Sequence, residues 1–239
     1  MNLVLDLGNT RIKAALFEAN VLKEKFTFPS TNDLLSFLGQ GEFDHALISS
    51  VNQSADELLP LIKTTGKKIK LRPGLPLPIQ NKYATPETLG VDRLAAACGA
   101  FHYFPNKSCL VIDAGTCINY EFIDEAGNYL GGAISPGIAM RFEAMHKFTA
   151  RLPLVEADAN VAMIGNSTET CMQSGVVHGA LNEVEGIIGK YVADYSGLVV
   201  ILCGGDASLF ENRLKHPIFV APDLILKGLN SILLYNVSI

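Results

Sequence analysis

The sequence predicts an α/β protein built from two domains of similar plan. Each half opens with an apolar strand, an Asp-x-Gly turn and a second strand, at 2–18 and 109–124. Helical and strand patterns then alternate in both halves. This repeat spans whole domains, unlike the short period of a solenoid. We place the boundary in the turn at 105–107, which gives domains 1–107 and 108–239.

The first half should form a sheet with a few helices. Its expected strands are 2–7, 11–18, 21–28, 45–51 and 67–71, and its expected helices are 32–38, 55–64 and 92–101. Thr31 is expected to cap the first helix, because a hydroxyl at that position accepts a backbone N–H. The apolar run 45–51 is typical of a buried strand parallel to the first. The alanine-rich run 92–101 predicts a buried helix of high propensity.

The second half repeats the plan. Its expected strands are 109–113, 117–124, 128–134, 198–203 and 218–220, and its expected helices lie after 137, at 174–195 and at 224–234. Apolar residues recur at helical spacing through 174–195, which predicts the longest helix there. The strand 198–203 is wholly apolar and precedes two glycines.

Composition narrows the class of protein. Of 239 residues, 49% are hydrophobic and 18% charged, as in compact globular proteins. The net charge of −5 argues against nucleic acid or an anionic membrane as the main partner. Five cysteines without a Cys-x-x-Cys predict buried free thiols in a reducing compartment. Since the chain also lacks a signal-peptide pattern and an apolar run of membrane-spanning length, we expect a cytoplasmic protein.

The first Asp-x-Gly loop has the groups that a phosphate site needs. It comprises Asp6, Leu7, Gly8, Asn9, Thr10, Arg11, Ile12 and Lys13. Asp6 ends a buried strand, where a carboxylate needs a cation or hydrogen bonds, and it can hold Mg²⁺ through water. Gly8 lets the backbone approach a ligand, while Asn9 and Thr10 add donors and Lys13 adds charge. An ordinary hairpin turn and a solvent-facing Lys13 remain alternatives.

A second loop and two glycine-rich passages extend this pattern. Asp113, Gly115 and Thr116 repeat the first motif, and two such loops facing each other would form a nucleotide cleft. Glycines at 131–137 and 204–205 follow strands, where ligands often approach the backbone. The apolar strand before 204 favours the nucleoside end of a nucleotide at that point. Tight turning would explain the glycines equally well.

The run Gly90-Val91-Asp92-Arg93 is unusual for a helix start, because Arg favours the opposite end of a helix. We expect this end to face the cleft. Arg93 would then bind an anionic group of the substrate, and Asp92 would accept a proton. The alternative is that Asp92 caps the helix while Arg93 forms a surface ion pair.

Taken together, these residues resemble the type III pantothenate kinases, a branch of the superfamily of acetate kinase, sugar kinases, heat-shock ATPases and actin. The resemblance follows the chain in order through 6–10, Tyr83, 90–93, 113–116, 131–137, 149–153, 165–168, 174–175 and Gly179. Two departures are small: Cys117 stands where alanine is commoner, and Gly165-Asn166-Ser167-Thr168 replaces a frequent Gly-Lys-Asn-Thr.

The resemblance implies two ribonuclease-H-like (actin-type ATPase) domains with a nucleotide cleft between them. It implies ATP-dependent phosphorylation of pantothenate to 4'-phosphopantothenate, the first step of coenzyme A synthesis, by a homodimer with its pantothenate pocket near the subunit contact. The residues implied to bind ATP with Mg²⁺ are 6–13 and Thr116. Asp92 is the implied general base, and Asp113 is the implied site for K⁺ or NH₄⁺. The implied pantothenate contacts are Tyr83, Gly90, Val91, Asp92, Arg93 and Thr168.

Three questions stay open at this level. Judged by its residue type alone, Asp113 would serve equally well as a second Mg²⁺ ligand. A different small-molecule kinase of the superfamily, acting on a sugar or a carboxylate, would use the same loops. A non-catalytic nucleotide-binding protein that acts as a transcriptional accessory factor is the third reading, against which the intact acids and the acidic pI argue.

Overall fold

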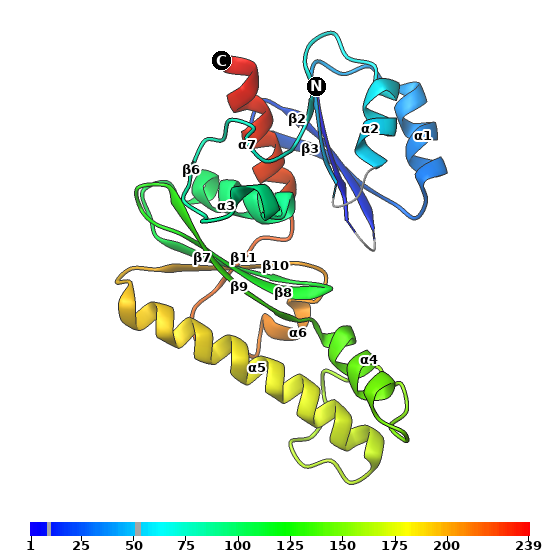
Figure 1. Cartoon of the computed structure of the whole chain (residues 1–239), viewed down its shortest axis with the longest axis vertical. Helices are drawn as coiled ribbons and strands as arrows, with labels where there is room; N and C mark the ends of the chain where they lie inside the picture. The colour runs from blue at the N-terminus through cyan, green and yellow to red at the C-terminus, as the bar shows by residue number, and fades with distance from the viewer. Residues whose placement is uncertain (9–10, 51–53) are drawn as a thin grey trace. The chain divides into compact units, whose positions relative to one another are not determined.

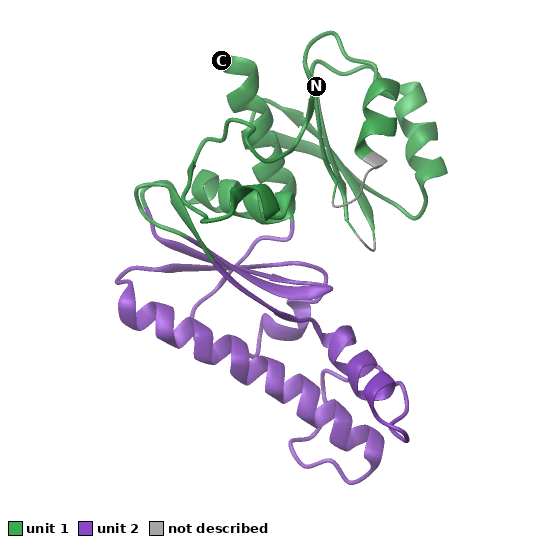
Figure 2. Ribbon diagram, in the orientation of Figure 1, with its two compact units in different colours: residues 1–106, 123–131, 223–239 green, residues 107–122, 132–222 purple. Residues whose placement is uncertain are grey.

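The computed structural model describes residues 1–8, 11–50 and 54–239. The chain forms two compact units, shown in Figure 2. The first comprises 1–106, 123–131 and 223–239, and the second 107–122 and 132–222. Among the described residues, no helix combines the length and apolar character that crossing a bilayer requires.

The first unit contains a five-stranded sheet of order β3-β2-β1-β4-β5 (Figure 1). Its strands are β1 (Asn2–Leu7), β2 (Ile12–Glu18), β3 (Val21–Phe28), β4 (Ala46–Ser50) and β5 (Lys68–Lys70). Its helices are α1 (Thr31–Gln40), α2 (Ser54–Leu58), α3 (Val91–Tyr103) and α7 (Leu224–Ser238), with 3₁₀ turns at Leu59–Leu61 and Pro86–Thr88. The expected hairpin of β1 and β2 is confirmed, and β4 pairs with β1 in parallel as expected.

Alternation along β1 gives this sheet two covered faces. Leu3, Leu5 and Leu7 point into a core that includes buried Leu34 and Leu38 of α1. The alternate residues of β1 point to the opposite face of the sheet, where α7 packs against β1, β2 and β4. Figure 1 shows α1 and α2 on one side of this sheet and α7 on the other. Asp6 therefore belongs to the face that α7 covers.

Helices α3 and α7 cross in close contact because glycines stand at the crossing. A Cβ added at Gly228 would clash with the carbonyl oxygen of Ala95, and one at Gly99 would clash with that of Leu224. The expected second domain contained α7, whereas the contacts assign α7 to the first unit. The physical reason is its apolar face, of which Leu229 and Ile232 are fully buried.

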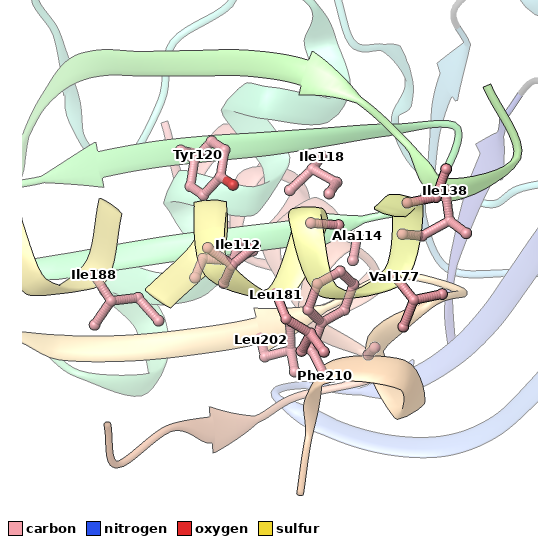
Figure 3. Close-up of a cluster of buried hydrophobic side chains, with 14 of the residues drawn as sticks. Ile112, Ala114, Ile118, Tyr120, Ile138, Val177, Leu181, Ile188, Leu202 and Phe210 are labelled. Atoms are coloured by element: carbon pink, nitrogen blue, oxygen red, sulfur yellow. The ribbon is translucent and has the colours of Figure 1, made fainter. Parts of the chain in front are cut away.

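The second sheet has the order β11-β10-β7-β8-β9-β6. Its strands are β6 (Gln80–Asn81), β7 (Cys109–Ala114), β8 (Cys117–Ile123), β9 (Asn128–Pro136), β10 (Val199–Cys203) and β11 (Phe219–Val220). The helices of the second unit are α4 (Ile138–Phe148), α5 (Thr168–Asp194) and α6 (Ala207–Phe210). In Figure 3, Val177 and Leu181 of α5 lie over Leu202 of β10 and Phe210 of α6 in one apolar cluster.

Four polar side chains hold the junction of β9 and α4. Arg141 forms an ion pair of 2.6 Å with Glu183 and donates to Ser135 Oγ at 2.9 Å. Tyr120 donates to Glu183 at 3.1 Å. Burial alone would raise the pKa of Glu183, but hydrogen bonds from Arg141, Ser135 and Tyr120 hold the pKa below its ordinary value. Burial and the neighbouring carboxylate raise the pKa of Tyr120, which stays a neutral donor.

Several local expectations were wrong. Ser30, not Thr31, caps α1, because the Ser30 hydroxyl accepts the Asp33 N–H at 3.3 Å. The helix expected at 55–64 ends at Leu58 and continues as a 3₁₀ turn, since Pro60 lacks a backbone N–H. Helix α5 begins at Thr168 instead of 174, with a capping box between Ser167 and Thr170. Residue 51, the expected end of β4, lies outside the described residues.

The cysteines are free thiols, as expected. Cys98, Cys109 and Cys203 are buried, and burial raises the pKa of Cys109 to about 12. The expectation that all five are buried was wrong for Cys171, which is exposed, and for Cys117, which is half-buried. Cys171 is exposed because it lies in the first turn and a half of α5, beside an open pocket.

Candidate functional site

The first phosphate loop is positioned by the pairing of β1 with β2 and β4. Asp6 is half-buried at the end of β1, opposite Lys13 on β2 and Ser49 on β4. In-register neighbours on paired strands project from one face, so these three side chains form a row across the sheet. Helix α3, which carries Asp92, contacts β4. The expected phosphate and proton-transfer groups therefore belong to one unit.

The other expected members of this loop contribute differently. Leu7 is buried and Arg11 exposed, so the Leu7 side chain belongs to the core. Ile12 is half-buried, and Asn9 and Thr10 lie outside the described residues. A Cβ added at Gly8 would make only an ordinary contact, 3.4 Å from the carbonyl oxygen of Arg11. Packing within the protein therefore does not require glycine at this position, and the close approach of a ligand remains as a reason for it.

The Asp92-Arg93 pair begins α3 in an arrangement that contradicts the surface alternative. Gly90 occupies the N-cap position, and Asp92 accepts the backbone N–H of Arg93 at 2.9 Å. Arg93 is 7% exposed, and its guanidinium carbon lies 5.5 Å from the centroid of the Tyr83 ring. A buried guanidinium over an aromatic face is held in place and its planar fork is suited to a carboxylate.

Tyr83 itself rests on a second aromatic ring. Its ring centroid is 6.2 Å from that of the buried Tyr129, with 28° between the planes. Gly131 has φ +102, and a Cβ there would come within 3.1 Å of Tyr83. The structure thus brings Tyr83, Gly90, Val91, Asp92 and Arg93 together in the first unit. Sequence reasoning missed Tyr129, for which only the nearby glycines gave a signal.

The second Asp-x-Gly loop meets both glycine-rich passages of the second unit. Asp113 ends β7 half-buried, and a Cβ at Gly204 (φ +96) would clash with the Ala114 carbonyl and meet an Asp113 carboxylate oxygen. Asp206 donates its N–H to Ala114 at 2.9 Å, and burial raises the pKa of its carboxyl. Gly137 donates to the Thr116 carbonyl at 3.1 Å. The structure therefore brings Gly137 and the segment 204–206 to the loop 113–116 at the strand ends of the second unit.

Thr168 lies apart from this grouping, at the first position of α5. It lines an open pocket with apolar walls on one side and a helix start on the other. The lining residues are Met145, Leu152, Gly165, Asn166, Ser167, Thr168, Cys171 and Met172. Thr168 belongs to the second unit, whereas the other expected pantothenate contacts belong to the first.

The carboxylates of Asp6 and Asp113 suit hard cations that take few ligands from the protein and keep water or phosphate oxygens as the others. Within the described ranges, no group of three or more His, Cys, Asp or Glu side chains forms a metal site. Mg²⁺ commonly binds one or two carboxylates, several waters and substrate phosphates, so a single Asp6 carboxylate fits it. Asp113, with the Ala114 carbonyl nearby, offers oxygen ligands of the kind that a monovalent cation takes.

Comparison with known proteins gives independent information on the family of this chain. Residues 2–190 match a family profile described as type III pantothenate kinase. A type III pantothenate kinase of Flavobacterium johnsoniae is 41% identical, with 100% of this chain and 99% of that protein covered. One from Bacteroides fragilis is 44% identical over 99% of this chain and 98% of its own length.

Solved structures show the same fold at lower identity. A Campylobacter jejuni protein assigned to the Baf family of transcriptional activators has a TM-score of 0.66 at 24% identity, with 99% of this chain and 100% of that chain covered. A glucokinase from an Antarctic psychrotroph has a TM-score of 0.51 at 14% identity, with 98% of each chain covered. At these identities the likeness shows the fold alone, and the expected class of ribonuclease-H-like α/β fold is confirmed.

Proposed function

Because the chain belongs to the type III pantothenate kinase family, we propose that it transfers the γ-phosphoryl group of ATP to the terminal hydroxyl of pantothenate. The products are ADP and 4'-phosphopantothenate, and the reaction begins coenzyme A synthesis. The observation that carries the proposal is the match of whole relatives, above 40% identity with nearly complete coverage of both chains.

The substrate end of the reaction is assigned to the cluster in the first unit. The pantothenate carboxylate would pair with the Arg93 guanidinium, which Tyr83 holds from one side. The Asp92 carboxylate would take the proton of the attacking hydroxyl as the hydroxyl oxygen bonds to the γ-phosphorus. The bond from that phosphorus to the bridging oxygen breaks, and ADP leaves with the electron pair. Thr168 is proposed as a further pantothenate contact.

The phosphate end is assigned to the two Asp-x-Gly loops. Residues 6–13 and Thr116 would bind the triphosphate through backbone N–H groups, and Lys13 would add charge. Bound Mg²⁺ would neutralise charge on the phosphate oxygens, and Asp6 would hold it through water. Phosphoryl transfer depends mainly on such positioning and charge neutralisation, so one carboxylate base suffices. We place this reaction in the cytoplasm, where free thiols persist.

A panel of acceptors tests the assignment of substrate. Purified protein with Mg²⁺ and ATP should add the mass of one phosphate to pantothenate, and acetate and hexoses should stay unmodified in parallel reactions. Phosphorylation of acetate or a hexose, with pantothenate unchanged, would instead identify a different kinase of the superfamily. Nucleotide binding without transfer to any acceptor would favour the accessory-factor alternative.

Asp113 is proposed as the ligand of a monovalent cation, K⁺ or NH₄⁺. Replacing K⁺ by Na⁺ at constant ionic strength should lower kcat sharply, because the smaller ion binds the same oxygens at a different distance. Initial rates in KCl and NaCl measure this. Asp113→Asn should remove the difference between the two salts, and equal rates of the unaltered protein in both salts would refute the role.

A homodimer is the proposed assembly, and the second unit offers a surface for it. Phe148 is 81% exposed, Ile164 86% and Leu154 61%, and their neighbours line the pocket that contains Thr168. Clustered exposed apolar side chains mark interaction surfaces. We assign this surface, defined by Phe148, Leu154 and Ile164, to a second copy of the chain.

Ile164→Asp should convert the dimer to a monomer, because an unpaired carboxylate in an apolar interface is costly. Light scattering coupled to size exclusion should show half the mass of the unaltered protein. Val21→Asp is the matched control: Val21 is also exposed (57%) but lies on β3 of the other unit, so its mass should not change. A dimer that survives Ile164→Asp would contradict the assignment of this surface.

A further inference from the structure

Ser49 is a buried polar residue that the proposed reaction has not yet used. It is 0% exposed at the end of β4, and its hydroxyl has no hydrogen-bond partner among the residues that the structure describes. Leaving a buried hydroxyl without a partner is costly, and such groups are rare in native structures. The position therefore calls for a physical reason beyond packing, since alanine would fill it at lower cost.

The register of the sheet places this hydroxyl beside Asp6. Ser49 is the parallel-strand partner of Asp6, and Asp6 is in turn paired with Lys13. All three belong to the face away from the core of Leu5, Leu7 and Ile48. Adjacent strands lie about 5 Å apart, so a serine hydroxyl and an aspartate carboxylate on neighbouring positions can come within hydrogen-bond distance by rotation about χ1.

The chemistry of the pair suits a carboxylate that must keep one orientation. A serine hydroxyl rotates freely and donates one hydrogen bond. Donation to an ionised carboxylate is about twice as strong as a bond between neutral groups. An aspartate that receives such a bond on one oxygen presents the other oxygen in a fixed direction. Groups of this kind, one layer behind a metal ligand, typically change metal affinity ~10-fold or more when removed.

We propose that Ser49 is a positioning residue of the nucleotide site, whose hydroxyl donates to the Asp6 carboxylate and orients it toward the metal-bound phosphates. This inference rests on the nucleotide site of the proposed function, and it adds a residue from a third strand to that site. Ser49 touches neither substrate in this account; it acts through Asp6.

Ser49→Ala tests the inference with two readouts that a purely structural role would move together. The affinity for ADP in the presence of Mg²⁺, measured by titration calorimetry, should fall ~10-fold. The midpoint of thermal unfolding of the protein without nucleotide should stay the same or rise, because the Ser49 hydroxyl is unpaired until its bond to Asp6 forms with the metal-bound nucleotide in place. The KM for pantothenate should not change, whereas kcat/KM for ATP should fall in step with ADP affinity.

Ser36→Ala is the control, since it makes the same chemical change in the same unit, on α1, where the exposed Ser36 hydroxyl donates to the Asn32 carbonyl at 3.0 Å. Its ADP affinity should equal that of the unaltered protein. The difference between Ser49→Ala and the unaltered protein should vanish when EDTA replaces Mg²⁺, because the bond acts through Asp6 and the metal. Unchanged ADP affinity in Ser49→Ala would overturn the inference, as would an equal loss in both variants with a lower unfolding midpoint.

ADP binding does not involve pantothenate, so the two proposals fail separately. A protein that binds ADP in a Ser49-dependent way but never phosphorylates pantothenate would retain this inference and lose the proposed substrate. A protein that phosphorylates pantothenate with full ADP affinity in Ser49→Ala would do the reverse.

Discussion

Replacing Asp92 by Asn should lower kcat at least ~10²-fold, the lower end of the range for a lost general base. The amide has nearly the same shape as the carboxylate, and its oxygen can still accept the Arg93 N–H that Asp92 accepts at 2.9 Å. The start of α3 should therefore keep its geometry, and only the capacity to take the proton is lost. The KM for pantothenate should change little, because Arg93 supplies the attraction for the carboxylate.

Glu87→Gln provides the control for this experiment. Glu87 is an exposed carboxylate in the 3₁₀ turn just before α3, so the same chemical change near the site should leave kcat unaltered. ADP affinity should be equal in both variants and in the unaltered protein. If Asp92→Asn kept more than a tenth of the original kcat, Asp92 would not be the general base.

Replacing Gly228 by Ala should destabilise the protein by about 3 kcal/mol, the upper part of the range for overpacking. The added Cβ would meet the Ala95 carbonyl and lie 2.9 Å from the backbone nitrogen of Gly99. Backbone atoms cannot move aside by a change of rotamer, so α7 must shift away from α3. Since α3 carries Asp92 and Arg93, kcat should also fall. Urea denaturation followed by circular dichroism measures the loss in unfolding free energy.

Gly186→Ala gives the matched comparison, because Gly186 also lies within a helix but a Cβ there would meet nothing within 4 Å. Replacing an exposed helical glycine by alanine should stabilise the protein by ~1 kcal/mol. Opposite signs for the same substitution would show that the crossing of α3 and α7 causes the loss. A Gly228→Ala protein as stable as the unaltered one would contradict the assignment of α7 to the first unit.

The local pattern was enough to predict the strands that carry the acids. Apolar runs before Asp6 and Asp113 end in an Asp-x-Gly turn in the sequence, and β1 and β7 end there in the structure. Burial of Arg93 could not be predicted, since residue type alone favours exposure for arginine. Its position depends on the Tyr83 ring, which is stacked on Tyr129 far along the chain.

Placement of the last helix also lay beyond the local pattern. The apolar face of α7 could be read from its sequence, but that face does not specify which sheet it covers. The answer depends on a fit between Gly228 of α7 and Ala95 and Gly99 of α3, more than a hundred residues apart in the chain. The role of Ser49 also could not be predicted from the local pattern, because its burial and its register with Asp6 follow from strand pairing.

The central claim is that this chain couples the cleavage of ATP to the phosphorylation of pantothenate. The most direct test is to measure ADP and 4'-phosphopantothenate in the same reaction, with Mg²⁺ and K⁺ present. The account predicts one ADP for each phosphorylated pantothenate, and negligible ADP when pantothenate is left out. ADP formed at the same rate without pantothenate, or with no phosphorylated product, would contradict it.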